Sequence, residues 1–124
     1  VKIAIRSNYS NPPSHGADIV TTILGDPDLW ARWEVELAGM RARIKDNRAR
    51  LVEALTSRGI PGDWAPIATQ RGMFALLGLT TEQVARLREE HAVYVVGKGR
   101  INVAGFTSAT FGPFADALAA VLAG

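Results

Sequence analysis

The sequence predicts an α+β fold, made of a long bridging helix and a small sheet covered by helices. The first observation is a stretch of about 30 residues in which large apolar side chains recur every three or four positions, the period of one helical stripe. The second is that short β-branched runs follow this stretch without regular strand–helix–strand alternation. The 124 residues are enough for one hydrophobic core.

Two helices are predicted in the first half of the chain, with a break between them. Residues 14–24 carry apolar side chains on one side and end before Gly25. Asp26 is a favourable N-cap for the second helix, and Pro27 suits its first position. Gly59 is expected to end this helix. Its apolar stripe comprises Trp30, Trp33, Leu37, Met40, Ile44, Leu51 and Leu55.

The length of the second helix suggests that it joins two bodies. At 1.5 Å per residue, about 30 helical residues extend roughly 45 Å. A compact domain of this chain's size has a radius of gyration of about 14 Å, so the helix is at least as long as the domain. Trp30 and Trp33 lie at one end of the helix. We therefore expect exposed apolar surface there, covered by self-association.

A short strand and a helix are predicted after the long helix. Residues 73–77 form an apolar run and are expected to be a buried strand. The sequence Thr80-Thr-Glu-Gln83 is a capping-box pattern, which opens a helix that extends to about residue 90. The strand would belong to the small sheet, and the helix would cover it.

A hairpin and a last helix are predicted in the remainder of the chain. Residues 93–96 and 101–103 are β-branched runs on either side of Gly97-Lys-Gly99, a spacing typical of a hairpin. Residues 107–122 are rich in alanine and are expected to form a helix. Along the sequence, predicted helices therefore both precede and follow the residues of the predicted sheet.

The composition excludes several kinds of site. The absence of cysteine rules out disulfides, thiolate metal sites and a cysteine nucleophile, and it is compatible with a cytoplasmic location. The histidines, His15 and His91, are too few for a histidine-rich metal site, so no metal centre is expected. No apolar run approaches the roughly 20 residues of a membrane span, and no secretory signal is recognisable. We therefore expect no membrane partner.

The densest basic cluster is predicted to be a solvated helix face. Acidic residues are interleaved with it at helix salt-bridge spacing, and aromatic residues do not alternate with its charges, so no nucleic-acid partner is expected. The net charge is only +2. A stand-alone binding module for acidic ligands or nucleic acid remains the alternative function, which a steep salt dependence of polynucleotide binding would favour. The cluster comprises Arg41, Arg43, Lys45, Arg48 and Arg50.

The segment Arg6-Ser-Asn-Tyr-Ser-Asn-Pro-Pro-Ser-His-Gly16 is predicted to be a rigid, irregular connector. Pro12 and Pro13 fix two φ angles and lack backbone donors, and the first of them makes Asn11 extended. Rigid polar loops often carry binding sites. The Arg6 guanidinium is suited to planar, bidentate contact with a carboxylate, although its position alone favours an ordinary surface arginine.

Two later segments contain further candidate residues. Gly72-Met-Phe-Ala75 places Phe74 at the start of a strand, where core packing is the first expectation and a pocket wall the second. Gly99-Arg-Ile-Asn-Val-Ala-Gly105 places Arg100 at the mouth of a strand, after a glycine that permits close approach of another group. Taken alone, an arginine in a hairpin is expected to be solvated.

Taken in order, these three segments closely resemble the C-terminal part of the aspartate/aromatic-amino-acid aminotransferases, class I enzymes of PLP fold type I that use pyridoxal 5'-phosphate (PLP). In that family, the arginine of the last segment binds the α-carboxylate of the substrate. The arginine before Asn-Pro-Pro binds the side-chain carboxylate of dicarboxylic substrates in the partner subunit of a homodimer. The resemblance implies these roles for Arg100 and Arg6. It also implies substrate-binding positions for Ser10 and Asn11 beside Arg6, and for Phe74.

The resemblance further implies that the catalytic machinery lies outside this chain. No segment resembles the family's PLP-binding lysine motif. A Schiff-base lysine requires burial or a cationic neighbour. The lysines of this chain are instead interpreted as solvated side chains; they are Lys2, Lys45 and Lys98. Residues 1–39 would be the end of the large, cofactor-binding domain and the start of the bridging helix. Residues 40–124 would be the small C-terminal domain.

The function implied is therefore that of a fragment of a transaminase. The intact enzyme would exchange amino groups between aspartate, glutamate or aromatic amino acids and 2-oxo acids, and the preference between these substrates stays open. The chain would supply the substrate-carboxylate arginines but no catalytic residue. We expect it to bind no PLP and to be inactive by itself, because the protein's contribution in such enzymes is to orient and tune the cofactor.

Overall fold

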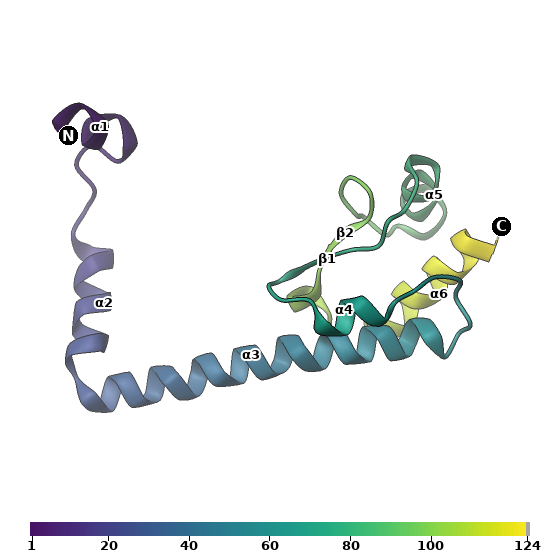
Figure 1. Ribbon diagram of the computed structural model, residues 1–124, viewed down its shortest axis with the longest axis horizontal. Coiled ribbons are helices and arrows are strands. Elements are labelled where there is room, and N and C mark those ends of the chain that lie inside the picture. The colour runs from purple at the N-terminus through teal and green to yellow at the C-terminus, as the bar shows by residue number, and fades with distance from the viewer. Residues whose placement is uncertain (124) are drawn as a thin grey trace. The chain divides into compact units, whose positions relative to one another are not determined.

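The computed structural model describes residues 1–123, which belong to two compact units, Val1–Gly39 and Met40–Gly124. The boundary falls inside helix α3 (Pro27–Thr56), which has 30 residues, as the apolar stripe predicts. The described residues are mostly helical, with one small two-stranded sheet, and this confirms the predicted α+β class (Figure 1). No helix among them combines the length and the apolar character needed to cross a membrane.

The first unit contains α1 (Lys2–Asn8), α2 (His15–Gly25) and the beginning of α3. The break between α2 and α3 forms as predicted, because Asp26 Oδ1 accepts hydrogen bonds from the N–H groups of Asp28 and Leu29 at 2.9 and 3.0 Å. None of the described residues of this unit is buried. Its apolar side chains therefore form no core.

The structure corrects the prediction for the segment around Arg6. Arg6 lies in the last turn of helix α1 and not in an irregular connector. The irregular part begins at Tyr9, and Ser10 has a φ of 53°. The Ser10 N–H donates to the Ile5 carbonyl at 3.0 Å, which closes the end of the helix. The constraint from Pro12 covers only the proline and the residue before it, so it does not extend back to Arg6.

The second unit has its own hydrophobic core. It combines the second part of α3 with α4 (Ala65–Thr69), α5 (Thr81–His91) and α6 (Phe111–Ala123). Helices α5 and α6 pack against each other (Figure 1). The capping box of α5 forms as predicted, with hydrogen bonds of 2.9 and 3.2 Å between Thr80 and Gln83. The fully buried apolar side chains are Leu51, Leu55, Leu87, Val103, Ala115 and Leu118.

The sheet of the second unit pairs β1 (Phe74–Leu76) with β2 (Arg100–Asn102) in antiparallel orientation. The register pairs Phe74 with Asn102, Ala75 with Ile101 and Leu76 with Arg100. Side chains alternate between the two faces, so the middle pair is buried and both outer pairs are exposed. The prediction of a buried strand over residues 73–77 is therefore wrong for the outward face of β1.

Two predicted elements are shorter in the structure. The hairpin over residues 93–96 and 101–103 is reduced to one bridge between Val96 and Arg100, and β2 instead pairs with β1. The last helix begins at Phe111 because residues 107–110 form a turn, in which the Thr110 N–H donates to the Thr107 carbonyl at 3.0 Å. Local propensity shows neither the partner of a strand nor a turn closed by a threonine hydroxyl.

Candidate functional site

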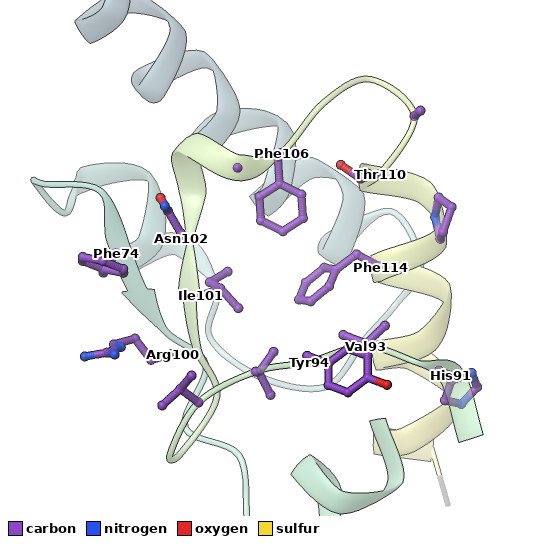
Figure 2. Close-up of a pocket in the computed structure, with 15 residues that line it drawn as sticks. Phe74, His91, Val93, Tyr94, Arg100, Ile101, Asn102, Phe106, Thr110 and Phe114 are labelled. Carbon is purple, nitrogen blue, oxygen red and sulfur yellow. The ribbon is translucent and has the colours of Figure 1, made fainter. Parts of the chain in front are cut away.

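Arg100 and Phe74 come together on the exposed face of the β1–β2 pair. The guanidinium carbon of Arg100 lies 5.2 Å from the centroid of the Phe74 ring, which is within cation–π range. Figure 2 shows these two side chains on one side of the strand pair and Ile101 on the other. Phe74 is 49% exposed, so the expectation of core packing for it is wrong. An arginine stacked on an aromatic ring keeps N–H donors for a planar anion.

The residues next to Arg100 show why this local sequence folds as it does. Gly99 is buried with a φ of +82°, and a Cβ there would lie 2.8 Å from a leucine side chain. Asn102 Oδ1 accepts a hydrogen bond from the Ala104 N–H at 3.0 Å and opens the 3-10 helix η1 (Val103–Gly105). The glycine thus permits close packing, the asparagine caps the turn, and the arginine between them faces outward.

A row of polar side chains on α3 binds the backbone on both sides of the strand pair. This polar row consists of Arg43, Asn47 and Arg48, which donate only to backbone carbonyls among the described residues. Arg48 bonds the carbonyls of Ile67, Gly72 and Phe74 at 3.0, 2.7 and 2.9 Å. Asn47 bonds those of Val103 and Phe106 at 3.0 and 3.3 Å, and Arg43 bonds those of Ala104 and Phe106 at the same two distances.

The polar row corrects the prediction that the basic cluster is a solvated helix face. Arg48 is only 1% exposed, and the Arg50 guanidinium carbon lies 4.6 Å from the centroid of the Phe111 ring. Three of the five basic side chains therefore have partners within the chain. A nucleic-acid module loses support accordingly, because the charges that would contact phosphates are already engaged.

A concave surface borders the strand pair. A cavity of about 560 Å³ has Arg100 and Phe74 in its lining. On the side of Ile101, the rings of Phe106 and Phe114 meet edge to face, with centroids 5.1 Å apart (Figure 2). Mostly apolar concavities with a few polar groups are the usual form of small-molecule sites.

The other predicted site residues lie in the first unit. Arg6, Ser10 and Asn11 are all exposed. Ser10 adopts a left-handed backbone conformation, which is uncommon for a residue with a side chain. Such backbone strain is often found at functional sites. The structure therefore groups the predicted residues into two sets, one in each unit.

Comparison with known proteins identifies the family of this chain. Residues 1–118 match the family model described as aminotransferase class I and II. The chain belongs to this aminotransferase family. It is 52% identical to an aspartate aminotransferase of Escherichia coli (strain K12) over 98% of the chain. It is also 49% identical to an aromatic-amino-acid aminotransferase of Pseudomonas aeruginosa over 95% of the chain.

A solved aminotransferase structure closely resembles the structure of this chain. The aromatic-amino-acid aminotransferase from Burkholderia pseudomallei, covalently bound to pyridoxal phosphate, superposes with a TM-score of 0.89 at 50% identity over 97% of the chain. The chain covers 30% of that structure, 31% of the E. coli relative and 30% of the Pseudomonas relative. The predicted family resemblance is therefore confirmed, and the chain spans about a third of the length of these relatives.

The lysines of this aminotransferase chain do not fit a PLP site. Lys2, Lys45 and Lys98 are all exposed. A lysine that forms a Schiff base needs a depressed pKa, which burial or a neighbouring cation provides. Among residues 1–123 there is also no group of histidine and acidic side chains that could hold a metal ion.

Sequence reasoning did not consider Asn47 and placed Arg48 on a solvated helix face, although a signal for the burial of Arg48 is present. The apolar stripe of α3 steps from Ile44 to Leu51, a gap of seven residues. Position 48 completes the three- and four-residue spacing within this gap, so a polar residue there faces the core. A charged side chain on a buried stripe indicates a specific set of partners, because an uncompensated buried charge is costly.

Proposed function

We propose that this chain is the substrate-carboxylate-binding part of a PLP-dependent transaminase. The intact enzyme would transfer an amino group between aspartate, glutamate or an aromatic amino acid and a 2-oxo acid. The observation that carries the proposal is the Arg100 guanidinium, stacked on the Phe74 ring on the exposed face of the strand pair. Every amino acid and 2-oxo acid has a carboxylate next to the reacting carbon, and a guanidinium binds that group in a bidentate way.

Arg100 and Arg6 would divide the recognition of the substrate. Arg100 would bind the α-carboxylate, with Phe74 as a wall of the pocket. Arg6, flanked by Ser10 and Asn11, would bind the side-chain carboxylate of a dicarboxylic substrate in the active site of the partner subunit. This requires a homodimer. The exposed apolar residues of the first unit support such self-association, because surface of this kind is commonly covered by a partner.

PLP would be held by the remainder of the intact enzyme. The cofactor supplies the electron sink that transamination requires, and the protein supplies its binding and orientation. Since the lysines of the chain are all exposed, we propose that the chain alone binds no PLP and is inactive. We also propose a cytoplasmic location, with which the absence of cysteine is compatible.

The roles of the two arginines are tested in the intact holoenzyme. Arg100→Ala should lower kcat/KM for aspartate and for phenylalanine alike, by about a hundredfold, because both substrates lose charged hydrogen bonds. Arg6→Ala should lower kcat/KM for aspartate by a similar factor and affect phenylalanine much less. Arg41→Ala, an exposed arginine on α3, is the matched control and should change neither. Equal losses on both substrates for Arg6→Ala would refute its assigned role.

The proposed lack of a cofactor site is tested on the 124-residue chain. The purified chain is incubated with PLP, reduced with borohydride and measured by intact mass spectrometry. An unmodified mass without Schiff-base absorbance is expected. Stoichiometric labelling of one of Lys2, Lys45 or Lys98 would show instead that the chain carries its own PLP site.

A further inference from the structure

We propose that the polar row Arg43, Asn47 and Arg48 positions the Arg100–Phe74 pair, with Arg48 as its central positioning residue. The proposal rests on the carboxylate-binding function proposed above. None of the three side chains would contact the substrate. Their role would be to fix the backbone from which the two substrate-binding side chains project.

Arg48 holds the start of β1 from within the second unit. Its guanidinium donates to the carbonyls of Gly72 and Phe74, and the Met73 carbonyl between them accepts the Val103 N–H at 2.7 Å. Three successive carbonyls are therefore fixed at the point where Phe74 leaves the backbone. Because the Phe74 ring stacks on the Arg100 guanidinium, a rotation of this backbone would change the surface on which Arg100 rests.

The other two members of the polar row hold the end of β2. Asn47 Nδ2 donates to the carbonyls of Val103, the first residue after the strand that carries Arg100, and of Phe106, the first residue after η1. Arg43 adds a second donor to the Phe106 carbonyl from the exposed side. Adjacent residues of one rigid helix, Asn47 and Arg48, thus set both strands of the pair, and sites supported by rigid elements keep tighter geometry than sites on loops.

The chemistry of the Arg48 side chain indicates a positioning role and not only a contribution to the stability of the fold. Its side chain is 1% exposed, its Nε is buried without a hydrogen bond, and the ion pairs among the described residues do not include it. A buried charge without a carboxylate is a poor source of stability, and well-packed apolar residues often serve as well or better. The guanidinium offers a planar fork that reaches several carbonyls at once, which a lysine does not.

The expected consequence of loosening this support is weaker carboxylate binding with unchanged chemistry. The carboxylate contact exists in both the ground state and the transition state. A loss of uniform binding raises KM and leaves kcat unchanged. A purely structural role would instead lower the amount of folded enzyme without changing KM.

The experiment uses the intact holoenzyme with four variants at matched concentrations of folded protein. Arg48→Lys keeps the charge but loses the fork, and Arg43→Met removes only the exposed donor. Arg50→Met is the matched control, because Arg50 contacts Phe111 and Asp46 and neither strand. Arg100→Lys is the reference for a damaged carboxylate site. The measurements are KM and kcat for aspartate, the Kd of succinate as a non-reacting dicarboxylate, and the thermal midpoint.

We expect Arg48→Lys to raise KM and the Kd of succinate by about tenfold with kcat within about twofold, since small misplacements of binding groups have effects of this size or larger. Arg43→Met should shift both constants by a smaller factor in the same direction, and Arg50→Met should shift neither.

Unchanged KM and Kd in a folded Arg48→Lys enzyme would overturn the inference, provided that Arg100→Lys weakens succinate binding. If Arg100→Lys also has no effect, the proposed function itself fails. If Arg48→Lys yields no folded holoenzyme, Arg43→Met decides: a raised KM supports the positioning role, and KM equal to that of Arg50→Met refutes it.

Discussion

The two units of the chain differ in how their helices relate to a core. In the second unit, Leu51, Leu87 and Leu118 are completely buried, and the strand pair that carries Arg100 rests on this core. In the first unit, none of the described residues is buried, and even Trp30 and Trp33 remain 40% exposed while contacting each other. Yet the helices of both units follow the same local signals of capping and apolar periodicity.

Secondary structure and the construction of the site therefore have separate origins in this aminotransferase chain. Local signals define helices in either unit, because they depend on neighbouring residues only. The Arg100–Phe74 arrangement requires a core and the polar row, which are present in the second unit. The Arg6 segment has no such support among the residues of its own unit, so we expect its geometry to depend on contacts beyond that unit.

The largest expected difference between the units concerns apolar truncation. Leu51→Ala removes a completely buried side chain and should lower the free energy of unfolding by about 2–5 kcal/mol. Leu24→Ala removes a side chain that is 45% exposed and should change it by less than about 0.5 kcal/mol. Urea unfolding of the chain measures both. Equal losses would show that the first unit has a core of its own.

A pair of glycine substitutions should act with opposite signs. Gly99→Ala places a methyl group 2.8 Å from Leu79 at a φ of +82° and should destabilise the second unit by about 1–3 kcal/mol. Gly16→Ala adds a methyl group within α2, where nothing lies within 4 Å, and should increase helix stability by about 0.5–1 kcal/mol. Circular dichroism during thermal unfolding reports both changes. Destabilisation by Gly16→Ala would reveal packing around α2.

Loss of a helix cap should cost about the same free energy in either unit. The two losses should, however, change different observables. Thr80→Ala removes the capping box of α5, and Asp26→Ala removes the cap of α3; each should cost about 1 kcal/mol. The first should lower the midpoint of cooperative unfolding. The second should lower helicity with little change in that midpoint, because the first unit lacks a core. A large shift of the midpoint by Asp26→Ala would contradict this separation.

The smallest expected effect concerns the stability of the folded state at acidic pH. The hydrogen bond from Arg86 lowers the pKa of Glu90 below its usual value of 4.5, so the pair stabilises the folded state above the unfolded pKa. This contribution should be lost as the pH falls through the lowered pKa, and Glu90→Gln should abolish it. Glu34→Gln, which removes an exposed carboxylate of the first unit, is the matched control. An unchanged profile for Glu90→Gln would show that the pair adds nothing in solution.

Much of the fold was predictable because its signals are local. The break at Asp26, the 30-residue helix and the capping box at Thr80 each depend on residues within one or two helical turns. The candidate site was predictable only as a set of residues. The family resemblance indicated Arg100 and Phe74, but not that they stack across two strands, because the partner of β2 depends on a contact between distant segments.

The family, the helices and the residue types at the candidate site follow from motifs and periodicity in the amino-acid sequence. The hydrogen-bond partners of Arg48 and the exposure of Phe74 are fixed only in the folded chain. Both depend on which backbone carbonyls and which sheet face meet α3 after folding. The physical reason is that a guanidinium in a helix has the same local chemistry whether it faces water or three carbonyls, and only packing distinguishes the two cases.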